Sequence, residues 1–237
     1  MHLQVDGLES GYGRVTVLHG IGIEVPAGVR VGLFGPNGHG KTTLLRTMSG
    51  IIRPRAGTVR FGDHDLTGAS PRTIVEHGLI HVPQGSTLFA RMTVLEALTL
   101  GAYAPRAWAQ RRQSLEKVFH LFPRLAERRA QRCSTLSGGE RQMAAIGAGL
   151  MGCPRLLMLD EPTLGLAPKI RAELARSIHA VAETGVGLLV VDQDVDMLLG
   201  LCGRLYLIEQ GCVAMDVQDR NQLQHKDVLK RYFGTAA

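Results

Sequence analysis

The segment Gly35–Thr43 reads GPNGHGKTT and satisfies the phosphate-binding pattern G-x-x-x-x-G-K-[ST]. An apolar run at Val29–Phe34 predicts a strand before it, and Lys41–Ser49 predicts a helix after it, which is the context that the pattern requires. The glycines let backbone N–H groups curl around phosphate oxygens, and the helix N-terminus adds its positive dipole. Lys41 can neutralise charge on the β- and γ-phosphates, and the Thr42 hydroxyl can bind Mg²⁺. The predicted nucleotide-binding residues of this loop are Gly35, Pro36, Asn37, Gly38, His39, Gly40, Lys41, Thr42 and Thr43.

Two adjacent carboxylates, Asp160 and Glu161, stand at the end of a predicted strand at Leu156–Asp160. The carboxyl ends of parallel strands open toward the ligand crevice, so both side chains are expected near the phosphates. Asp160 can hold Mg²⁺ through water, and Glu161 can accept a proton from a water that attacks the γ-phosphate. A solvated acidic turn is the alternative, because Glu-Pro is common in turns. Downstream of a phosphate-binding loop, we favour the catalytic interpretation.

The segment Ser137–Glu140 forms a capping box, with Ser137 as the N-cap of a helix and Glu140 three residues later. A plain helix start is the alternative. Two consecutive glycines, Gly138 and Gly139, disfavour it, because each costs about 1 kcal/mol relative to alanine in a helix. We expect that something approaches this backbone closely and that its N–H groups form a second anion site. One phosphate-binding loop and a separate helix terminus of this kind need a partner chain to bring them together.

Apolar runs alternate with helical patterns along most of the chain, which predicts an α/β fold with a mainly parallel sheet. Further buried strands are predicted at Leu79–Val82, Leu156–Asp160, Gly187–Val191 and Leu205–Glu209. An N-terminal antiparallel β subdomain is predicted at Leu3–Leu8, Ile21–Val25 and Thr58–Phe61, which have strand patterns without helices between them. The stretch from about Thr93 to Met151 has no strand pattern and is predicted to be an inserted helical subdomain.

The net charge of +6 is concentrated in this helical insertion. Between Ala104 and Arg132 the chain has eight basic residues against only Glu116 and Glu127. Such a patch could be a solvated helical face, lie against anionic lipid headgroups or bind nucleic acid. We favour the solvated face, then the membrane, because we find no aromatic residues interleaved with the arginines as stacking platforms.

The composition is that of a folded chain, with 45% hydrophobic and 20% charged residues. Every uncharged apolar stretch falls well short of the roughly 20 residues that a membrane-spanning helix requires. The first ten residues carry Asp6 and Glu9 and show no secretory signal pattern, so we expect the chain to stay in the cytosol. The four cysteines are widely spaced with no C-x-x-C pair, which predicts reduced thiols and no zinc site.

Five motifs in series resemble those of the ATP-binding cassette (ABC) ATPases, the motor subunits of membrane transporters. They are GPNGHGKTT, HVPQG with Gln84, LSGGERQ, LLMLDEPT and LGLAP, and their order and spacing agree over about Leu3–Phe233. The resemblance is closest to the short ATPase subunit of branched-chain amino acid importers. The features that carry it are the run LFPRLAERRAQ at Leu121–Gln131, LGLAP at Leu164–Pro168, and Gln193 in VVDQDVD.

The resemblance implies ATP and Mg²⁺ as cofactors and a role for each matching residue. Tyr12 matches the aromatic residue that stacks on adenine, with a core tyrosine as the alternative. Gln84 matches the residue that touches Mg²⁺ and the attacking water, with a solvated loop glutamine as the alternative. Ser137 and Gly139 match residues that contact the γ-phosphate of the opposite subunit, and Gly138 lies between them. The implied catalytic residues are Glu161, Gln193 and Gln84, and the implied metal ligands are Thr42, Gln84 and Asp160.

Three positions depart from the usual pattern of this family. Gln193 stands where most cassette ATPases have a histidine that supports the γ-phosphate; glutamine can hydrogen-bond but cannot carry charge. The same glutamine is usual in the short importer subunit. His39 replaces a small residue, and we expect a solvent-facing side chain there that could touch a phosphate if protonated. Gly203 stands where an Asp usually precedes the arginine, which weakens any inference about Arg204.

The resemblance implies a single ABC ATPase domain over residues 1–237. Residues 1–92 and 152–237 are expected to form the nucleotide-binding core with the β subdomain, and about 93–151 the helical subdomain ending in the signature helix. The segment Leu164–Pro168 matches the loop that crosses the dimer interface, with an ordinary loop before a helix as the alternative.

The implied function is an ATP-hydrolysing motor subunit of a membrane importer for branched-chain amino acids or a related small polar solute. Expected partners are a second ABC ATPase in a head-to-tail heterodimer, integral membrane permease subunits and, indirectly, a solute-binding protein. The expected location is the cytoplasmic face of the cell membrane, and no nucleic acid partner is expected. The alternatives are a system for urea, amides or another solute, and a non-transport ABC ATPase acting on nucleic acid. The last is disfavoured because the chain has neither a long coiled-coil insertion nor a second cassette.

Overall fold

The computed structural model describes residues 2–85 and 88–218 of the chain. The described residues form two compact units, one of residues 2–69 and 189–218 and the other of residues 70–85 and 88–188. Antiparallel and parallel strand pairs occur together with helices, which confirms the predicted α/β class. The expected division into a nucleotide-binding core and a helical subdomain at 93–151 stays a prediction. Residues 219–237 of the predicted core lie outside the described residues.

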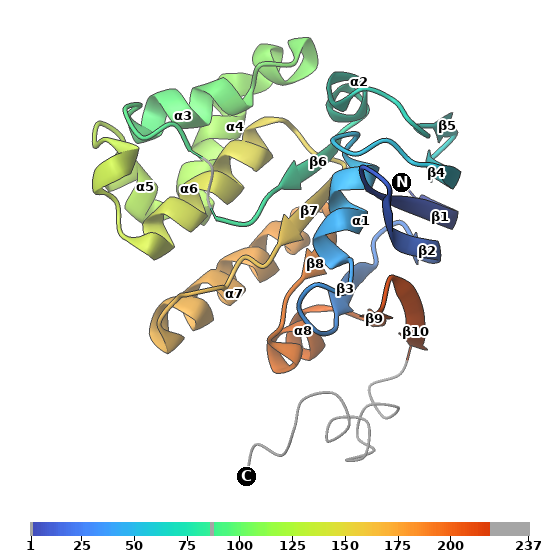
Figure 1. The fold of residues 1–237 in the computed structure, drawn as a ribbon. Coiled ribbons are helices and arrows are strands. Elements are labelled where there is room, and N and C mark those ends of the chain that lie inside the picture. Colours follow the sequence, from blue (N-terminus) through green and yellow to red (C-terminus); the bar gives the residue numbers. More distant parts are fainter. Residues whose placement is uncertain (1, 86–87, 219–237) are drawn as a thin grey trace. The chain divides into compact units, whose positions relative to one another are not determined.

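The first unit carries two groups of paired strands and two helices in its described part (Figure 1). Its elements are β1 (Leu3–Tyr12), β2 (Val15–Val25), β3 (Arg30–Phe34), α1 (Lys41–Met48), β4 (Ala56–Phe61), β5 (His64–Asp65), β8 (Gly187–Val191), α8 (Val195–Leu201), β9 (Arg204–Glu209) and β10 (Cys212–Val217). Only the last three residues of β8 belong to this unit.

The first sheet has the order β2-β1-β4-β5, and β1 is antiparallel to both β2 and β4, as predicted. β1 and β2 run further than their apolar patterns indicate. The reason is a series of register shifts, beginning between Val5 and Leu8, which break the strict alternation of buried and exposed residues.

The remaining strands of this unit follow the order β10-β9-β3-β8, and β3 is parallel to β9. Val31–Phe34 of β3 is fully buried, which anchors the glycine-rich loop that follows it. β10 pairs antiparallel with β9 through a turn at Gln210 and Gly211, whose φ values are 48° and 74°. Two left-handed residues are typical of tight hairpins. The sequence pattern does not predict β10, because most of its residues are exposed or half-buried.

The second unit combines one pair of parallel strands with most of the helices (Figure 1). Its elements are α2 (Pro71–Glu76), β6 (Leu79–Val82), α3 (Val94–Gly101), α4 (Pro105–Leu121), α5 (Pro123–Glu127), a 3₁₀ turn (Cys133–Thr135), α6 (Gly138–Met151), β7 (Leu156–Asp160) and α7 (Pro168–Glu183). Among the described residues between 93 and 151 the only strand-like pairing is one isolated bridge, which joins Thr93 to Arg132. Helices therefore replace strands over this stretch, as predicted.

Close packing of α3 on α6 depends on small residues. A Cβ added to Gly101 would lie 2.1 Å from the backbone oxygen of Ala148, and one added to Gly147 would lie 2.9 Å from a methyl carbon of Leu98. Contacts below 3 Å cannot be accommodated by backbone atoms, so the two helices approach because these positions lack side chains. Figure 1 shows α3, α4, α5 and α6 gathered as one helical group. Helix α6 is therefore held firmly within that group.

The basic patch differs from the expectation in one respect. The guanidinium of Arg111 stacks over the half-exposed ring of Trp108, 4.2 Å from its centroid. The expectation that no aromatic residue interleaves with the arginines is therefore wrong, because residues three apart on a helix lie on one face. Arg106, in the same helix, donates to the backbone oxygen of Cys153 over 2.6 Å.

All four cysteines are free thiols, as predicted. Within residues 2–85 and 88–218, no cluster of three or more histidine, cysteine, aspartate or glutamate side chains suited to a metal ion is found. Over the same residues, no helix has the length and apolar character needed to cross a membrane.

Candidate functional site

The glycine-rich loop between β3 and α1 closes around the ammonium group of Lys41. This side chain is 4% exposed, and its Nζ donates to the backbone oxygens of Gly35 and Pro36 over 2.7 and 2.9 Å. Gly35 has a φ of 140°, and a Cβ there would lie 2.1 Å from the backbone oxygen of Ile208 in β9. Only glycine fits position 35. The loop therefore holds the Lys41 ammonium at its centre with a backbone conformation that depends on this glycine.

Thr42 and Thr43 occupy the first turn of α1, where Thr42 is half-buried and Thr43 is buried. Asn37 and Gly38 are exposed at the tip of the loop. The loop with its lysine and the start of α1 together present the backbone amides, charge and hydroxyl groups that a nucleotide phosphate requires.

His39 is not the solvent-facing side chain that we expected. It is half-buried, and its Nδ1 accepts a hydrogen bond of 3.1 Å from the backbone N–H of Gln210. The backbone N–H of Gly211 donates to the oxygen of His39 over the same distance. The β9–β10 turn therefore rests on the glycine-rich loop. Since Nδ1 accepts, the ring proton of neutral His39 lies on Nε2.

Tyr12 lies at the end of β1, and 46% of its surface is exposed. Its hydroxyl accepts a hydrogen bond of 3.2 Å from Arg46 in α1. This exposure argues against the interpretation of Tyr12 as a core tyrosine. An aromatic ring held at the surface of the unit that carries the loop can stack on a planar base.

Asp160 ends the fully buried strand β7, and Glu161 directly follows it. Asp160 is 1% exposed and Glu161 8% exposed. Glu161 has a φ of 46°, in the left-handed region that residues other than glycine rarely adopt. Such backbone strain costs of order 1 kcal/mol or more and is concentrated at functional sites. Sequence reasoning found the carboxylate but could not detect this conformation.

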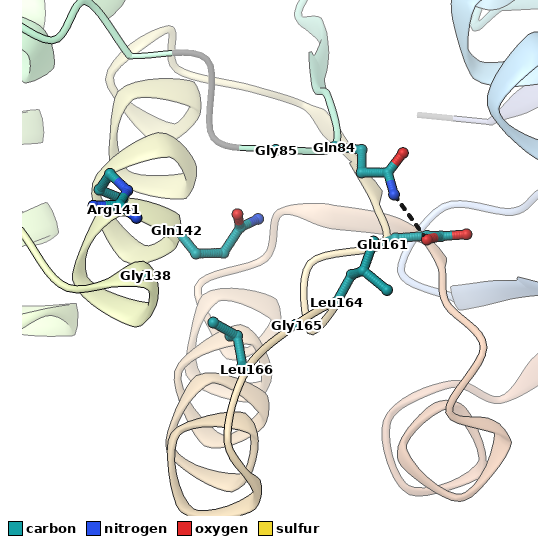
Figure 2. Close-up of a pocket in the computed structure, with 9 residues that line it drawn as sticks. All are labelled: Gln84, Gly85, Gly138, Arg141, Gln142, Glu161, Leu164, Gly165 and Leu166. Carbon is teal, nitrogen blue, oxygen red and sulfur yellow. Dashed lines mark hydrogen bonds between the residues drawn. The ribbon is translucent and has the colours of Figure 1, made fainter. Parts of the chain in front are cut away.

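Gln84 and Glu161 lie together because β6 and β7 are neighbouring parallel strands whose carboxyl ends meet at one edge. The side-chain amide of Gln84 donates to Oε2 of Glu161 over 3.0 Å. This pair lies at a pocket of about 520 Å³ in the second unit (Figure 2). The pocket is lined by Gln84, Gly85, Gly138, Arg141, Gln142, Glu161, Leu164, Gly165 and Leu166.

The start of α6 has the predicted capping box. The backbone N–H of Glu140 donates to Oγ of Ser137 over 3.3 Å, and the N–H of Ser137 donates to Oε2 of Glu140 over 2.9 Å. Burial alone raises the pKa of Glu140, but hydrogen bonds from Ser137 and the guanidinium of Arg128 outweigh it and lower the pKa. The carboxylate is therefore ionised at neutral pH and locks the first turn of α6.

Gly138 and Gly139, in the first turn of α6, have different surroundings. A Cβ at Gly139 would lie 2.3 Å from Cγ2 of Ile170, so the close approach that we expected comes there from the chain's own helix α7. A Cβ at Gly138 would make only an ordinary contact of 3.7 Å with Leu166. Packing within the described chain therefore accounts for Gly139 and does not require Gly138, whose edge of the pocket is open to a ligand.

Gln193 is exposed between β8 and α8 in the first unit. It is flanked by Asp192, whose Oδ1 accepts from the backbone N–H of Asp194 over 2.9 Å, and by Asp194, which caps α8. The structure therefore places Gln193 in a tight, hydrogen-bonded turn.

Arg141 and Gln142 line the pocket but were assigned no role from the sequence. Arg141 donates to the backbone oxygen of Leu136, and Gln142 is 7% exposed. The available signal was their position directly after Gly139 and Glu140 in LSGGERQ. Residues three and four apart on a helix share one face, so a functional Gly138 implies that Arg141 and Gln142 lie beside it.

Comparison with known proteins places this chain in a family. Residues 18–164 match the family described as ABC transporter. The chain is 39% identical over 232 residues to BraG of Pseudomonas aeruginosa, a high-affinity branched-chain amino acid transport ATP-binding protein, covering 98% of this chain and 99% of that protein. It is 28% identical over 250 residues to BraF, described in the same words in the same organism, covering 99% of this chain and 98% of that protein.

Among solved structures, an ATP-binding cassette of an ABC transporter in its ADP conformation is similar, with a TM-score of 0.86 at 24% identity. The similarity covers 99% of this chain and 100% of that chain. The chain belongs to the ABC transporter family, and it is an ATPase of that family.

Proposed function

We propose that this chain is the ATP-hydrolysing motor subunit of a membrane importer for branched-chain amino acids or a related small polar solute. The likeness to BraG over nearly the full length of both chains supports the solute class. The proposal of ATP hydrolysis rests on one observation: Glu161 is buried, has a left-handed backbone conformation and accepts a hydrogen bond from Gln84. A carboxylate positioned in this way is suited to accept a proton from an attacking water.

In this proposal the first unit binds the nucleotide. The ammonium of Lys41 exchanges its contacts with the loop carbonyls for oxygens of the β- and γ-phosphates, while the loop amides surround them. The exposed ring of Tyr12 stacks on adenine. The hydrogen bonds of His39 with the β9–β10 turn hold the loop in place.

The proposed ligands of Mg²⁺ are the Thr42 hydroxyl, the Gln84 amide and the Asp160 carboxylate. All three offer oxygen atoms, which Mg²⁺ prefers, so the donor set fits this ion. When bound, Mg²⁺ neutralises charge on the phosphate oxygens. Asp160 is held in place by its position at the end of the buried strand β7.

The start of α6 is proposed to serve a second subunit. In a head-to-tail dimer, Ser137, Gly138 and Gly139 of one chain contact the γ-phosphate held by the loop of the other. The open edge at Gly138 and the pocket beside it support this assignment. The loop Leu164–Pro168, which contributes Leu164, Gly165 and Leu166 to the same pocket, is proposed to cross the dimer interface.

We propose that the second subunit is a different cassette ATPase, one that has histidine at the position of Gln193. Two copies of this chain would make two sites without that histidine, whereas a mixed pair makes one site of each kind. The presence of BraG and BraF as two distinct ATP-binding proteins in one organism supports a mixed pair. Permease subunits at the cytoplasmic face of the membrane, served by a solute-binding protein, complete the proposed assembly.

The assembly is tested by purifying the transporter from its native membrane and measuring the intact mass of each ATPase species. We expect this chain with one other cassette ATPase and permease subunits. Two copies of this chain with no other cassette protein would refute the heterodimer. If the pair is mixed, Gln193→His should raise turnover by less than about twofold, because the partner's site already carries most of the hydrolysis.

The solute is tested by reconstituting the purified complex with its binding protein in vesicles and following uptake of radiolabelled leucine, isoleucine and valine. ATP-dependent uptake of these amino acids is expected. The Glu161→Gln complex serves as the control without hydrolysis. Uptake of urea or short amides alone would support the alternative solute class instead.

A further inference from the structure

The run Leu121–Gln131 carries much of the resemblance to the short importer subunit, but the proposed function gives it no role. Its arginines differ in what they contact. Arg124 pairs with Glu173 of α7 over 3.2 Å, Arg128 pairs with Glu140 of α6, and Arg129 is exposed. Two arginines of the predicted solvated basic patch therefore form ion pairs with helices α7 and α6.

Arg128 connects the end of α5 to the first turn of α6. Its Nε donates to Oε1 of Glu140, and its Nη1 donates to Oε1 of Gln131 over 3.4 Å. Gln131 in turn donates from Nε2 to Oγ1 of Thr135 over 3.0 Å, in the 3₁₀ turn just before the signature segment. Arg128 is thus connected to the first turn of α6 through Glu140 and to the 3₁₀ turn before it through Gln131.

Glu140 is the residue through which this contact acts on the pocket. It is 7% exposed, and its two carboxylate oxygens are used differently: Oε2 accepts from the N–H of Ser137, and Oε1 accepts from Arg128. The two bonds together fix the rotamer of Glu140 and hence the N-cap geometry of Ser137, because a charge-assisted bond is about twice as strong as a neutral one. Without Arg128, Oε1 of a largely buried carboxylate loses its charged donor.

We propose that Arg128 is a positioning residue for hydrolysis: through Glu140 it holds Ser137 and Gly138 in the geometry that contacts the nucleotide of the partner subunit. This inference rests on the proposed function, in which α6 acts across a dimer. The proposed effect of Arg128 is confined to the first turn of α6. The nucleotide affinity of the chain's own loop, which lies in the other unit, is not expected to depend on Arg128.

The test compares five variants of the full chain in the purified transporter complex: Arg128→Ala, Arg128→Lys, Glu140→Gln, the double variant that combines Arg128→Ala with Glu140→Gln, and Arg129→Ala. Arg129→Ala is the matched control, because it removes the same charge one residue away at an exposed position. Two quantities are measured for each: the turnover number of the complex at saturating ATP, and the affinity of the isolated chain for a fluorescent ATP analogue.

We expect Arg128→Ala to lower turnover about fivefold while the affinity of the isolated chain changes less than about twofold. Arg128→Lys, which keeps a donor and the charge, should recover at least half of the turnover. Glu140→Gln should reproduce the loss, and combining it with Arg128→Ala should add nothing further, since both act through one bond. Arg129→Ala should match the wild type.

Turnover in Arg128→Ala equal to that in Arg129→Ala would overturn the inference, as would additive losses in the double variant. If Arg128→Ala does not fold, Arg128→Lys and Glu140→Gln decide by the same criteria, because each changes a single bonding group. A failure of the proposed function looks different: the wild-type complex would then hydrolyse no ATP, and no variant could be compared with it.

Discussion

The side-chain amide of Gln84 donates a hydrogen bond of 3.0 Å to Oε2 of Glu161, so the residues that follow β6 and β7 form one polar pair. The two strands are parallel neighbours, which brings positions 77 residues apart in sequence into contact. Gln84 therefore positions the carboxylate that we propose as the base.

Replacing Gln84 tests this contact. Gln84→Ala removes the donor that orients Glu161 together with a proposed Mg²⁺ ligand, and turnover of the complex is expected to fall about tenfold. The affinity of the isolated chain for ATP measured without Mg²⁺ should not change, because the phosphate-binding loop is intact. Gln84→Glu replaces the amide by a carboxylate, which cannot donate a hydrogen bond when ionised, so turnover should fall at least as far as in Gln84→Ala. Turnover in Gln84→Ala equal to that of the wild type would contradict the proposed role of the contact between the two side chains.

Two further variants distinguish binding from chemistry. Lys41→Ala removes the cation at the centre of the loop and is expected to weaken equilibrium ATP binding by at least about tenfold. Glu161→Gln keeps the shape of the side chain, so it should bind ATP normally and lose most turnover. Equilibrium binding of a nucleotide analogue and steady-state hydrolysis measure the two effects. Near wild-type turnover in Glu161→Gln, with the proper partners present, would rule out Glu161 as the base.

Two helical glycines should respond in opposite directions to the same change. Gly101→Ala forces a Cβ against the backbone of Ala148, which cannot move aside, and should destabilise the protein by about 1–3 kcal/mol. Gly200, in α8, is exposed with nothing within 4 Å of an added Cβ. Gly200→Ala should therefore stabilise by up to about 1 kcal/mol through helix propensity. Thermal unfolding of both variants checks the pair, and a lower midpoint for Gly200→Ala than for Gly101→Ala would contradict the helix packing described above.

Thiol labelling should follow burial and pKa. Burial raises the pKa of Cys202 to about 12, so at pH 8 its thiolate is scarce and its sulfur is covered. Burial also raises the pKa of Cys133. Cys212 is exposed and should react first with a thiol reagent, and Cys212→Ser should remove that fast phase. Mass mapping of the labelled native chain provides the measurement; early modification of Cys202 would show that α8 opens readily.

The sequence alone was enough for the local features of this protein. The strands Leu79–Val82, Leu156–Asp160 and Gly187–Val191 have the predicted bounds, because each is a short apolar run with clear stops on either side. The capping box at Ser137 also forms as predicted, since a cap depends on only four consecutive residues. The resemblance to the family could be recognised for a similar reason: each motif is a run of consecutive residues, and the order of the motifs along the chain can be read directly from the sequence.

Only the tertiary structure decided which distant residues meet. The bond of Gln84 to Glu161 and the bond of His39 to the turn at Gln210 each join separate elements. Arg128 reaches Glu140 in the same way, across the 3₁₀ turn between two helices. No periodicity or propensity encodes such contacts, because they depend on how whole elements pack and not on the residues beside them. The left-handed backbone of Glu161 belongs here as well: local preference disfavours that conformation, and the packing around β7 holds it nonetheless.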